Sequence, residues 1–492
     1  MKKQILLVSG LLLVAGCGMW AVGPDYKEPE IVALDVPAPD AGFPTTNKTE
    51  TGEFQVATAE NDPRVVITSE TIGAWWNQFN DDILTNLVAA AVSNNLSFLM
   101  AQERLVQARW SLVGSAAAFM PKVSMDGTYT RSGAHRFTSS RWASGSNYHG
   151  DLWKSGFDAT WEIDVFGGTR RAYESADAAL SAAECSLENA WVSLTAEIGS
   201  QYISLRTVQE RMRVARANLK LQSETYDILK SRLDSGIGDE LAVNQAKYNV
   251  EQTRASIPNL LATEERHMNA LAILSGTMPG ALHMMLRELP ERDWLIAPQR
   301  LESIPLDTMR ARPDVRAAER ALAAQVAAVG VAESQLFPKF YINGSLGLDS
   351  VKANKFFRRD AFLASIGPSF SWPIFQGGNL VAAMKIEESK MNEAALKYEL
   401  AVQTAYEETR NAYSAYTQEY HRYQSLQGAV KAATDAVNIS QDLYKNGLAD
   451  FNNVLDAQRS LLTLAESLTI SRGNITLNLI ALYKALGGGI SL

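Results

Sequence analysis

The chain of 492 residues contains only two cysteines, Cys17 and Cys185. A disulfide framework of the kind that holds small secreted domains together is therefore excluded. If Cys17 is modified, no disulfide can form within the chain. We interpret Cys185 as a small hydrophobic residue packed between helices.

The sequence also lacks a basic stripe, long apolar runs and catalytic motifs. Its net charge is −8, so a nucleic-acid partner is not expected. After residue 17 no run of 18 apolar residues occurs, so no helix is expected to cross a membrane. The five histidines are scattered without metal-ligand spacing, and no nucleophile elbow, phosphate loop or dinucleotide turn is present. We expect neither enzyme activity nor a metal or cofactor.

Residues 1–16 have the form of a signal peptide, with Lys2 and Lys3 preceding the apolar run ILLVSGLLLVAG. The run ends in VAGC, which resembles a bacterial lipobox and predicts lipidation of Cys17. A plain secretory signal with an incidental cysteine is the alternative. Residues 17–73 are rich in Pro, Asp, Glu and Thr, so we expect a lipidated, extended tether rather than a packed element.

The rest of the chain repeats itself. AAFMPKVSMDGTYT at 117–130 matches SQLFPKFYINGSLG at 334–347, and SGIGDELAVNQA at 235–246 matches NGLADFNNVLDA at 446–457. We predict a first repeat at 74–300 and a second at 301–492. Each contains a helix, a β-hairpin, a long helix, a tight turn and a further helix.

Four segments of about ten residues alternate between apolar and polar side chains, as a transmembrane β-barrel requires. The clearest is GFDATWEIDVFGG at 156–168, where the alternation continues to Val165. Three of its polar residues are carboxylates: Asp158, Glu162 and Asp164. A soluble sandwich would alternate too, but four strands would then leave two open edges and no covering sheet.

Two long segments, 169–234 and 379–445, contain no proline. Both are rich in Ala, Glu, Gln and Leu, and their apolar residues recur at intervals of three and four residues. This pattern predicts long coiled-coil helices. Within one protomer, such long helices cannot be covered by neighbouring helices on both sides. We therefore expect other subunits beside them.

Several motifs together resemble the TolC-type outer membrane factors, most of all the lipid-anchored ones of resistance-nodulation-division efflux pumps. These motifs are GPDYKEPE after the lipobox, WWNQFND at 75–81, RPDVRAAERALAA at 312–324, WPIFQGG at 372–378 and GLADFNNVLDAQRSL at 447–461. The resemblance implies an α+β membrane protein. Three protomers with four strands each would form a twelve-stranded outer membrane β-barrel, continuous with a long periplasmic α-helical barrel.

The same resemblance implies a function and a set of partners. The protein would be a passive, gated duct that exports drugs or other small molecules through the outer membrane. Its partners would be two further copies of itself, a periplasmic adaptor protein, an inner-membrane resistance-nodulation-division transporter and outer membrane lipid. The alternative is a lipid-anchored periplasmic coiled-coil spacer without a pore.

The resemblance further implies sites at the two turns between helices. We expect an adaptor to dock at these tips, which carry Gly236 and Asp239 in one repeat and Gly447 and Asp450 in the other. A mere turn is the alternative, and the two interpretations are compatible because glycine supplies the turn while the flanking surface docks.

The family's periplasmic gate would lie just after the second tip, at Asp456 and Arg459, which share one helix face. Asn452 and Asn453 stand where relatives often carry a leucine or a second acid. The alternative makes Asp456 a first-turn residue favoured by the helix dipole and Arg459 its exposed ion-pair partner.

The resemblance also places loops 132–153 and 350–360 outside the cell. Aromatic residues near the strand ends are candidates for interfacial girdles, with ordinary packing as the alternative for each. These candidates are Tyr129, Trp153, Trp161, Phe340 and Trp372.

Overall fold

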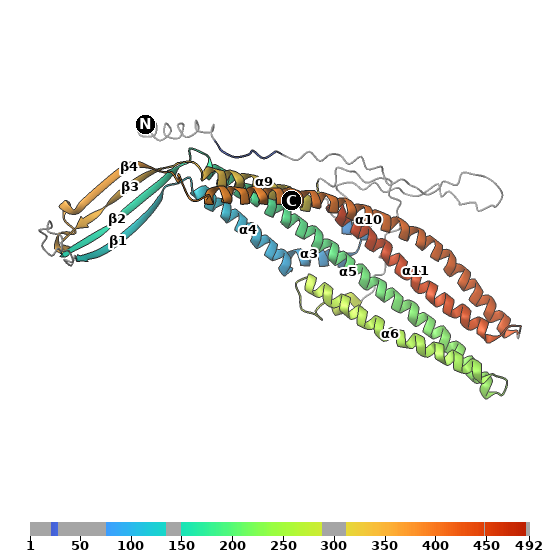
Figure 1. The fold of residues 1–492 in the computed structure, drawn as a ribbon. Helices are drawn as coiled ribbons and strands as arrows, with labels where there is room; N and C mark the ends of the chain where they lie inside the picture. The colour runs from blue at the N-terminus through green and yellow to red at the C-terminus, as the bar shows by residue number, and fades with distance from the viewer. Residues whose placement is uncertain (1–20, 28–74, 134–148, 288–310, 447, 489–492) are drawn as a thin grey trace, which may run out of the picture. The chain divides into compact units, whose positions relative to one another are not determined.

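The computed structural model describes residues 21–27, 75–133, 149–287, 311–446 and 448–488 (Figure 1). These residues form two compact units. One unit holds the β-sheet and the helix segments nearest to it in sequence, within 105–183 and 317–398, together with the short segment 21–27. The other holds the remaining helices. Cys17, Gly447 and the tether beyond residue 27 lie outside the described residues.

The elements occur in the order that the repeat predicts. The first series is η1 (Trp75–Phe79), α3 (Asp82–Asn94), α4 (Leu96–Ala117), β1 (Lys122–Gly133), β2 (His149–Ile163), α5 (Gly168–Asp234), α6 (Glu240–Leu274) and α7 (His283–Arg287). The second is α9 (Pro313–Ser334), β3 (Lys339–Ser350), η2 (Ala353–Lys355), η3 (Arg359–Ala361), β4 (Phe362–Ser371), α10 (Asn379–Lys445) and α11 (Phe451–Ala485).

Equal element lengths support the internal duplication. Helices α5 and α10 each have 67 residues, and α6 and α11 each have 35. α5 and α10 are proline-free, as the sequence indicated, whereas α6 contains Pro258. The boundary between the repeats at 300/301 stays a prediction.

The four strands form one antiparallel sheet in the order β1-β2-β3-β4. β2 begins at His149 and ends at Ile163, so the expectation that the alternation continues as strand to Val165 was wrong at this end. The reason is a tight turn in which the Val165 amide donates to the Ile163 carbonyl at 2.9 Å. The first hairpin's connection is also shorter than the predicted 132–153, because the strands extend to Gly133 and from His149.

Residues 21–27 are docked on the sheet unit, which corrects the expectation of a loose tether for this segment. The Arg171 side chain, only 7% exposed, donates to the carbonyls of Val22 and Gly23, each at 3.2 Å, and to Asp25 at 2.6 Å. The Val22 amide in turn donates to the carbonyl of Phe166. A buried guanidinium needs acceptors for its donors, and this segment supplies them.

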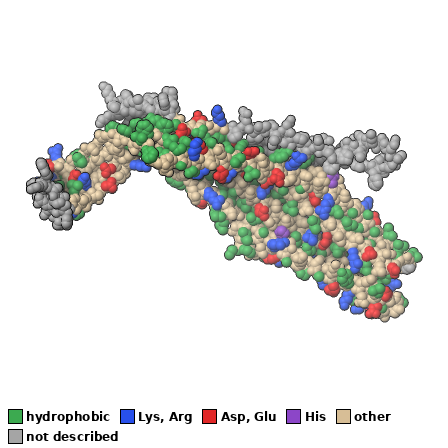
Figure 2. All heavy atoms as spheres, in the orientation of Figure 1, with side chains coloured by type: hydrophobic (Ala, Val, Ile, Leu, Met, Phe, Trp, Pro, Cys, Tyr) green, Lys and Arg blue, Asp and Glu red, His purple; other side chains and the backbone are tan. Residues whose placement is uncertain are grey.

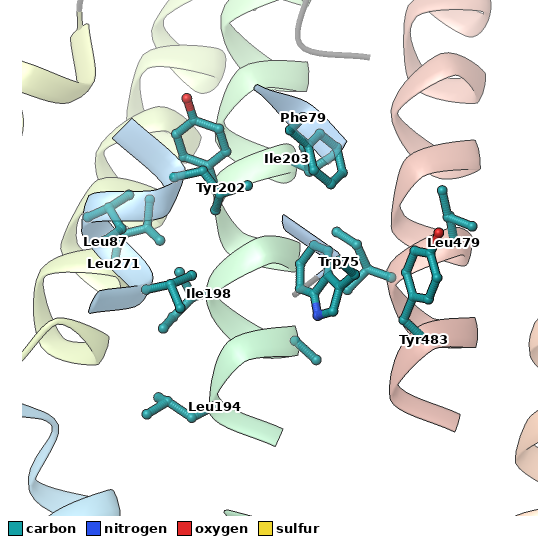
Figure 3. Close-up of a cluster of buried hydrophobic side chains, with 14 of the residues drawn as sticks. Trp75, Phe79, Leu87, Leu194, Ile198, Tyr202, Ile203, Leu271, Leu479 and Tyr483 are labelled. Carbon is teal, nitrogen blue, oxygen red and sulfur yellow. The ribbon is translucent and has the colours of Figure 1, made fainter. Parts of the chain in front are cut away.

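The helical unit has its hydrophobic core around Trp75 (Figure 3). Trp75 is 2% exposed, stacks on Tyr483 and meets Phe79 edge to face. Gly199 on α5 leaves the room for it, because a Cβ there would lie 2.2 Å from the Trp75 ring. The motif WWNQFND is therefore a core motif, ending in Asp81, which caps α3 by accepting from the amide of Ile83.

Candidate channel surface and helical tips

The sheet has one apolar and one polar face across all four strands. Residues paired directly across strands share a face. One row of pairs runs Met125, Phe157, Leu346, Ala364, and the adjacent row runs Ser124, Asp158, Ser345, Ser365. The alternation read from the sequence is thus in register from strand to strand.

The polar face is linked by hydrogen bonds and ion pairs between strands. Asn343 donates to Ser369 and the hydroxyls of Ser345 and Ser365 meet, each contact at 2.7 Å. Lys339 pairs with Glu162 at 3.7 Å, and Lys154 pairs with Asp349 at 3.6 Å. Charged side chains of this kind belong against water, whereas the opposite rows suit lipid.

Within the described residues, neither outer strand of the sheet has a second neighbour. There β1 pairs only with β2, and β4 pairs only with β3. The unpaired backbone groups of such edges cannot remain exposed in hydrocarbon. The sheet is therefore an incomplete structure for a membrane unless another chain completes it.

Aromatic residues lie near both ends of the strands. Trp161 donates its indole N–H to the carbonyl of Phe119 at 2.9 Å, and its repeat equivalent Trp372 donates to Leu336 at 3.1 Å. At the hairpin end the rings of Tyr129 and Trp153 lie 4.3 Å apart. Their placement in membrane girdles stays a prediction.

The first helical tip, between α5 and α6, is fixed by backbone geometry. Gly236 has φ +78°, and the following Ile237 amide donates to the Arg232 carbonyl at 3.0 Å. A Cβ on Gly238 would lie 2.4 Å from the Leu233 nitrogen. Asp239 caps α6 by accepting from the Leu241 amide at 3.0 Å.

The second tip, between α10 and α11, has the same closing backbone hydrogen bond but lacks the side-chain cap. The Leu448 amide donates to the Leu443 carbonyl at 2.9 Å, matching the bond made by Ile237. Ala449 stands at the position of Gly238. Asp450 precedes α11 but forms no side-chain capping bond.

The two tips share one apolar cluster and each exposes one large apolar residue. The cluster comprises Leu229, Ala242, Val243, Ala246, Phe451, Val454 and Leu455. Ile237 and Leu448, equivalent in the repeat, are 71% and 74% exposed. Our sequence interpretation named the glycines and aspartates and missed these two side chains, although the repeat alignment places them opposite each other.

The predicted gate residues lie on an exposed face of α11. Asn452, Asn453 and Asp456 are exposed. A guanidinium nitrogen of Arg459 lies 3.8 Å from a carboxylate oxygen of Asp456. The alternative to the gate placed Asp456 in the first turn of the helix, and this was wrong. α11 begins at Phe451, so Asp456 lies in the second turn, where the helix dipole has little effect.

Arg459 has further partners on α6 that the sequence did not indicate. Its Nε donates to the Asn249 side-chain oxygen at 2.9 Å, and its guanidinium lies 5.6 Å from the centre of the Tyr248 ring. Asn249 is 3% exposed, so this contact holds α11 against a buried position of α6. Arg459 therefore links the two hairpins in addition to pairing with Asp456.

The RPD motif forms a buried ionic cluster in the helical unit. Arg312, 5% exposed, makes two hydrogen bonds to Asp314 at 3.0 and 2.7 Å and one to Glu408 at 2.7 Å. It also donates to the carbonyl of Ala485, the last residue of α11. Burial alone would raise the pKa of Asp314, but the Arg312 guanidinium outweighs it and lowers that pKa.

In the described part of the chain no single helix is long and apolar enough to cross a membrane, although the bent pair α3 and α4 passes the same test together. The described residues contain no cluster of His, Cys, Asp or Glu arranged for a metal ion. The two-faced sheet with open edges and the two long helical hairpins are the arrangement expected of a pore-forming membrane protein.

The comparisons with known proteins agree with that class. Residues 87–277 and 307–488 match the model of the family described as outer membrane efflux protein. Nodulation protein T from Rhizobium leguminosarum bv. trifolii is 31% identical over 93% of this chain and 91% of its own length. The pyoverdine export outer membrane protein OpmQ from Pseudomonas aeruginosa is 26% identical over 99% of this chain and 97% of its own. The solved outer-membrane channel OprN superposes with a TM-score of 0.81 at 31% identity, covering 95% of this chain and 99% of that one.

The chain belongs to the outer membrane efflux protein family. The predicted fold class, the outer membrane location and the function as an efflux channel are confirmed. The family model matches once in each half, in keeping with the duplicated elements. The comparisons favour the channel over the coiled-coil spacer.

Proposed function

We propose that three copies of this chain form the exit duct of a tripartite efflux pump. A periplasmic adaptor and an inner-membrane resistance-nodulation-division transporter complete the pump. The duct is passive and has no catalytic role. The observation that carries the proposal is the strand register, in which apolar and polar rows continue across all four strands while both edges stay open. Threefold closure removes these edges and encloses the polar face around water.

The test of this duct is electrical. Purified full-length protein reconstituted into planar bilayers should conduct ions as a trimer. A protein that is monomeric and recovered soluble would instead support the periplasmic spacer.

Adaptor docking is assigned to the two helical tips. The exposed Ile237 and Leu448 offer equivalent apolar contacts at the two tips, beside Gly236 and Asp239 in one repeat and Gly447 and Asp450 in the other. Photo-cross-linkers at positions 237 and 448 should capture a periplasmic adaptor, while a cross-linker at the exposed Val351 of the β3–β4 connection should not. Capture from position 351 alone would place the docking surface elsewhere.

The periplasmic gate is assigned to Asp456 and Arg459, with Asn452 and Asn453 on the preceding turn. Threefold symmetry would bring three Asp456 carboxylates together, and their repulsion requires cations or hydrogen bonds across subunits. Arg459 also donates to Asn249, which holds α11 against α6 within the protomer. We propose that this contact helps to keep the gate closed. Asp456→Ala with Arg459→Ala should raise single-channel conductance and admit vancomycin, whereas an unchanged closed state would place the constriction elsewhere.

The N-terminal assignments complete the proposal. Residues 1–16 are removed as a signal peptide, and residues 17–73 begin with a lipid on Cys17. The two repeats follow at 74–300 and 301–492. Cys17→Ala with an ordinary signal peptide should still give membrane-inserted trimers, because a spanning barrel holds more firmly than acyl chains. Recovery of this variant only from the soluble periplasmic fraction would refute the barrel.

A further inference from the structure

The connection between β3 and β4, residues Val351–Ala361, has an unusual charge. We call it the β3–β4 loop; it joins these two strands at the hairpin end of the sheet (Figure 1). Its sequence VKANKFFRRDA carries four basic side chains and one carboxylate, in a chain whose net charge is −8. The basic residues, all exposed, are Lys352, Lys355, Arg358 and Arg359.

These cations have no carboxylate partner among the described residues. The carboxylates at the same end of the sheet are already engaged, since Asp349 pairs with Lys154 and Asp151 accepts from Tyr129 at 3.0 Å. The other hairpin connection, 134–148, contains no Asp or Glu in its sequence. Among the described residues, only Asp360 of the loop itself offsets these four cations, which leaves the β3–β4 loop a net positive charge for a partner of opposite sign.

The same loop holds a phenyl ring in the open. Phe357 is 89% exposed, and its ring meets that of Phe356 edge to face at 5.1 Å. Short turns fix the backbone here, with Arg358 donating to Lys355 and Ala361 donating to Arg358 through their main chains. An ordered segment with cations around an exposed aromatic ring is typical of a membrane interface.

We propose that the β3–β4 loop binds phosphorylated lipids at the surface of the outer membrane. The four cations contact phosphate groups of the head groups, and Phe357 enters the layer beneath them. Charge complementarity selects an anionic partner, and the exposed ring selects one with apolar material under its charges. A free anion offers no such layer. The inference goes beyond the export function and rests only on the outer membrane location of the sheet.

The test measures lipid binding to the purified full-length protein. Diphosphoryl lipid A in detergent micelles is titrated onto the protein, and bound lipid is counted by native mass spectrometry. Combined Lys352→Gln, Lys355→Gln, Arg358→Gln and Arg359→Gln should weaken binding by at least about tenfold at low salt. The difference should shrink as salt is raised, because exposed charges are screened. Phe357→Ser should weaken binding while leaving its salt dependence intact.

A control variant with the same change of charge separates this loop from general electrostatics. It combines Arg254→Gln, Lys385→Gln, Lys397→Gln and Lys445→Gln, all exposed positions on helices, and should bind lipid A as the unmodified protein does. Equal weakening in both variants, or none in the loop variant, would overturn the proposal. So would displacement of the lipid by equimolar inorganic phosphate, or an altered ion selectivity of the loop variant with unchanged lipid binding.

Discussion

Helices α5 and α10 are equivalent in the repeat and equal in length, yet the chain buries them very differently. α5 contributes many core residues, among them Ile198, Tyr202 and Leu205, each at most 1% exposed. Within α10 only Ala405, Thr409, Tyr416 and Val437 are buried. At equivalent positions α5 has Gly199 under the Trp75 ring, and α10 has Arg410 in solvent.

The difference indicates which surfaces the chain completes by itself and which it leaves for other copies. α10 exposes large apolar side chains along its length, including Leu396, Leu400 and Ile439. Figure 2 shows hydrophobic side chains gathered over α9 and the first part of α10. Contiguous exposed apolar patches mark interaction surfaces. We infer that α5 specifies the fold of one protomer and α10 its assembly.

The largest effect is expected in the core under α5. Trp75→Ala removes a buried ring that stacks on Tyr483, and should cost ~3–5 kcal/mol of folding free energy. Thermal unfolding followed by circular dichroism measures this loss. Arg410→Ala, at the α10 position equivalent to Gly199, should cost little; a comparable loss would refute the contrast between the helices.

The exposed face of α10 gives the next effect. Leu400→Ser should leave the protomer's own fold intact but weaken trimers by about 1.5–3 kcal/mol per side chain that assembly buries. Dissociation temperature on semi-native gels is the readout. Its polar neighbour Lys397, 69% exposed, serves as the control through Lys397→Ser. If the two variants dissociate alike, Leu400 faces solvent in the assembly.

A smaller, pH-dependent effect is expected where α10 meets the ionic cluster of Arg312. The folded pKa of Asp314 is lowered from 3.8, so its contribution to stability is present above that value. The contribution is lost as pH falls through the folded pKa. Asp314→Asn should therefore cost ~1–2 kcal/mol at pH 7, reduced by partial exposure, and this cost should shrink steadily as the pH falls below 3.8. A cost that stays the same across the acid range down to acid unfolding would assign the effect to packing.

The smallest effect distinguishes the two tips. Asp239→Ala removes a side-chain cap from α6 and should cost about 1 kcal/mol. Asp450→Ala removes no such bond and should be near neutral in stability. Hydrogen exchange of the first turns of α6 and α11 measures both. Equal loss of protection in the two variants would mean that the caps do not differ in solution.

The sequence predicted the parts of this protein that repeat or alternate. The alternation of apolar and polar side chains predicts the two faces of each strand. The extent of α10 is predicted by a long proline-free segment that ends at the glycine of the tip. The contacts of Arg171 with residues 22–25, of Arg312 with Ala485 and of Arg459 with Asn249 could not be predicted, because each joins segments far apart in sequence. The residues next to a buried arginine in the sequence do not indicate which distant carbonyl or carboxylate accepts its hydrogen bonds.

The central claim is that the row containing Asp158 lines a water-filled channel while the adjacent row containing Phe157 faces lipid. It is tested by single cysteines at these two neighbouring positions, in a Cys185→Ala background, with the trimer reconstituted in planar bilayers. A charged, water-soluble methanethiosulfonate reagent should change the conductance of the Asp158→Cys channel and leave that of Phe157→Cys unaltered. Equal modification at both positions, or modification at 157 alone, would contradict the account.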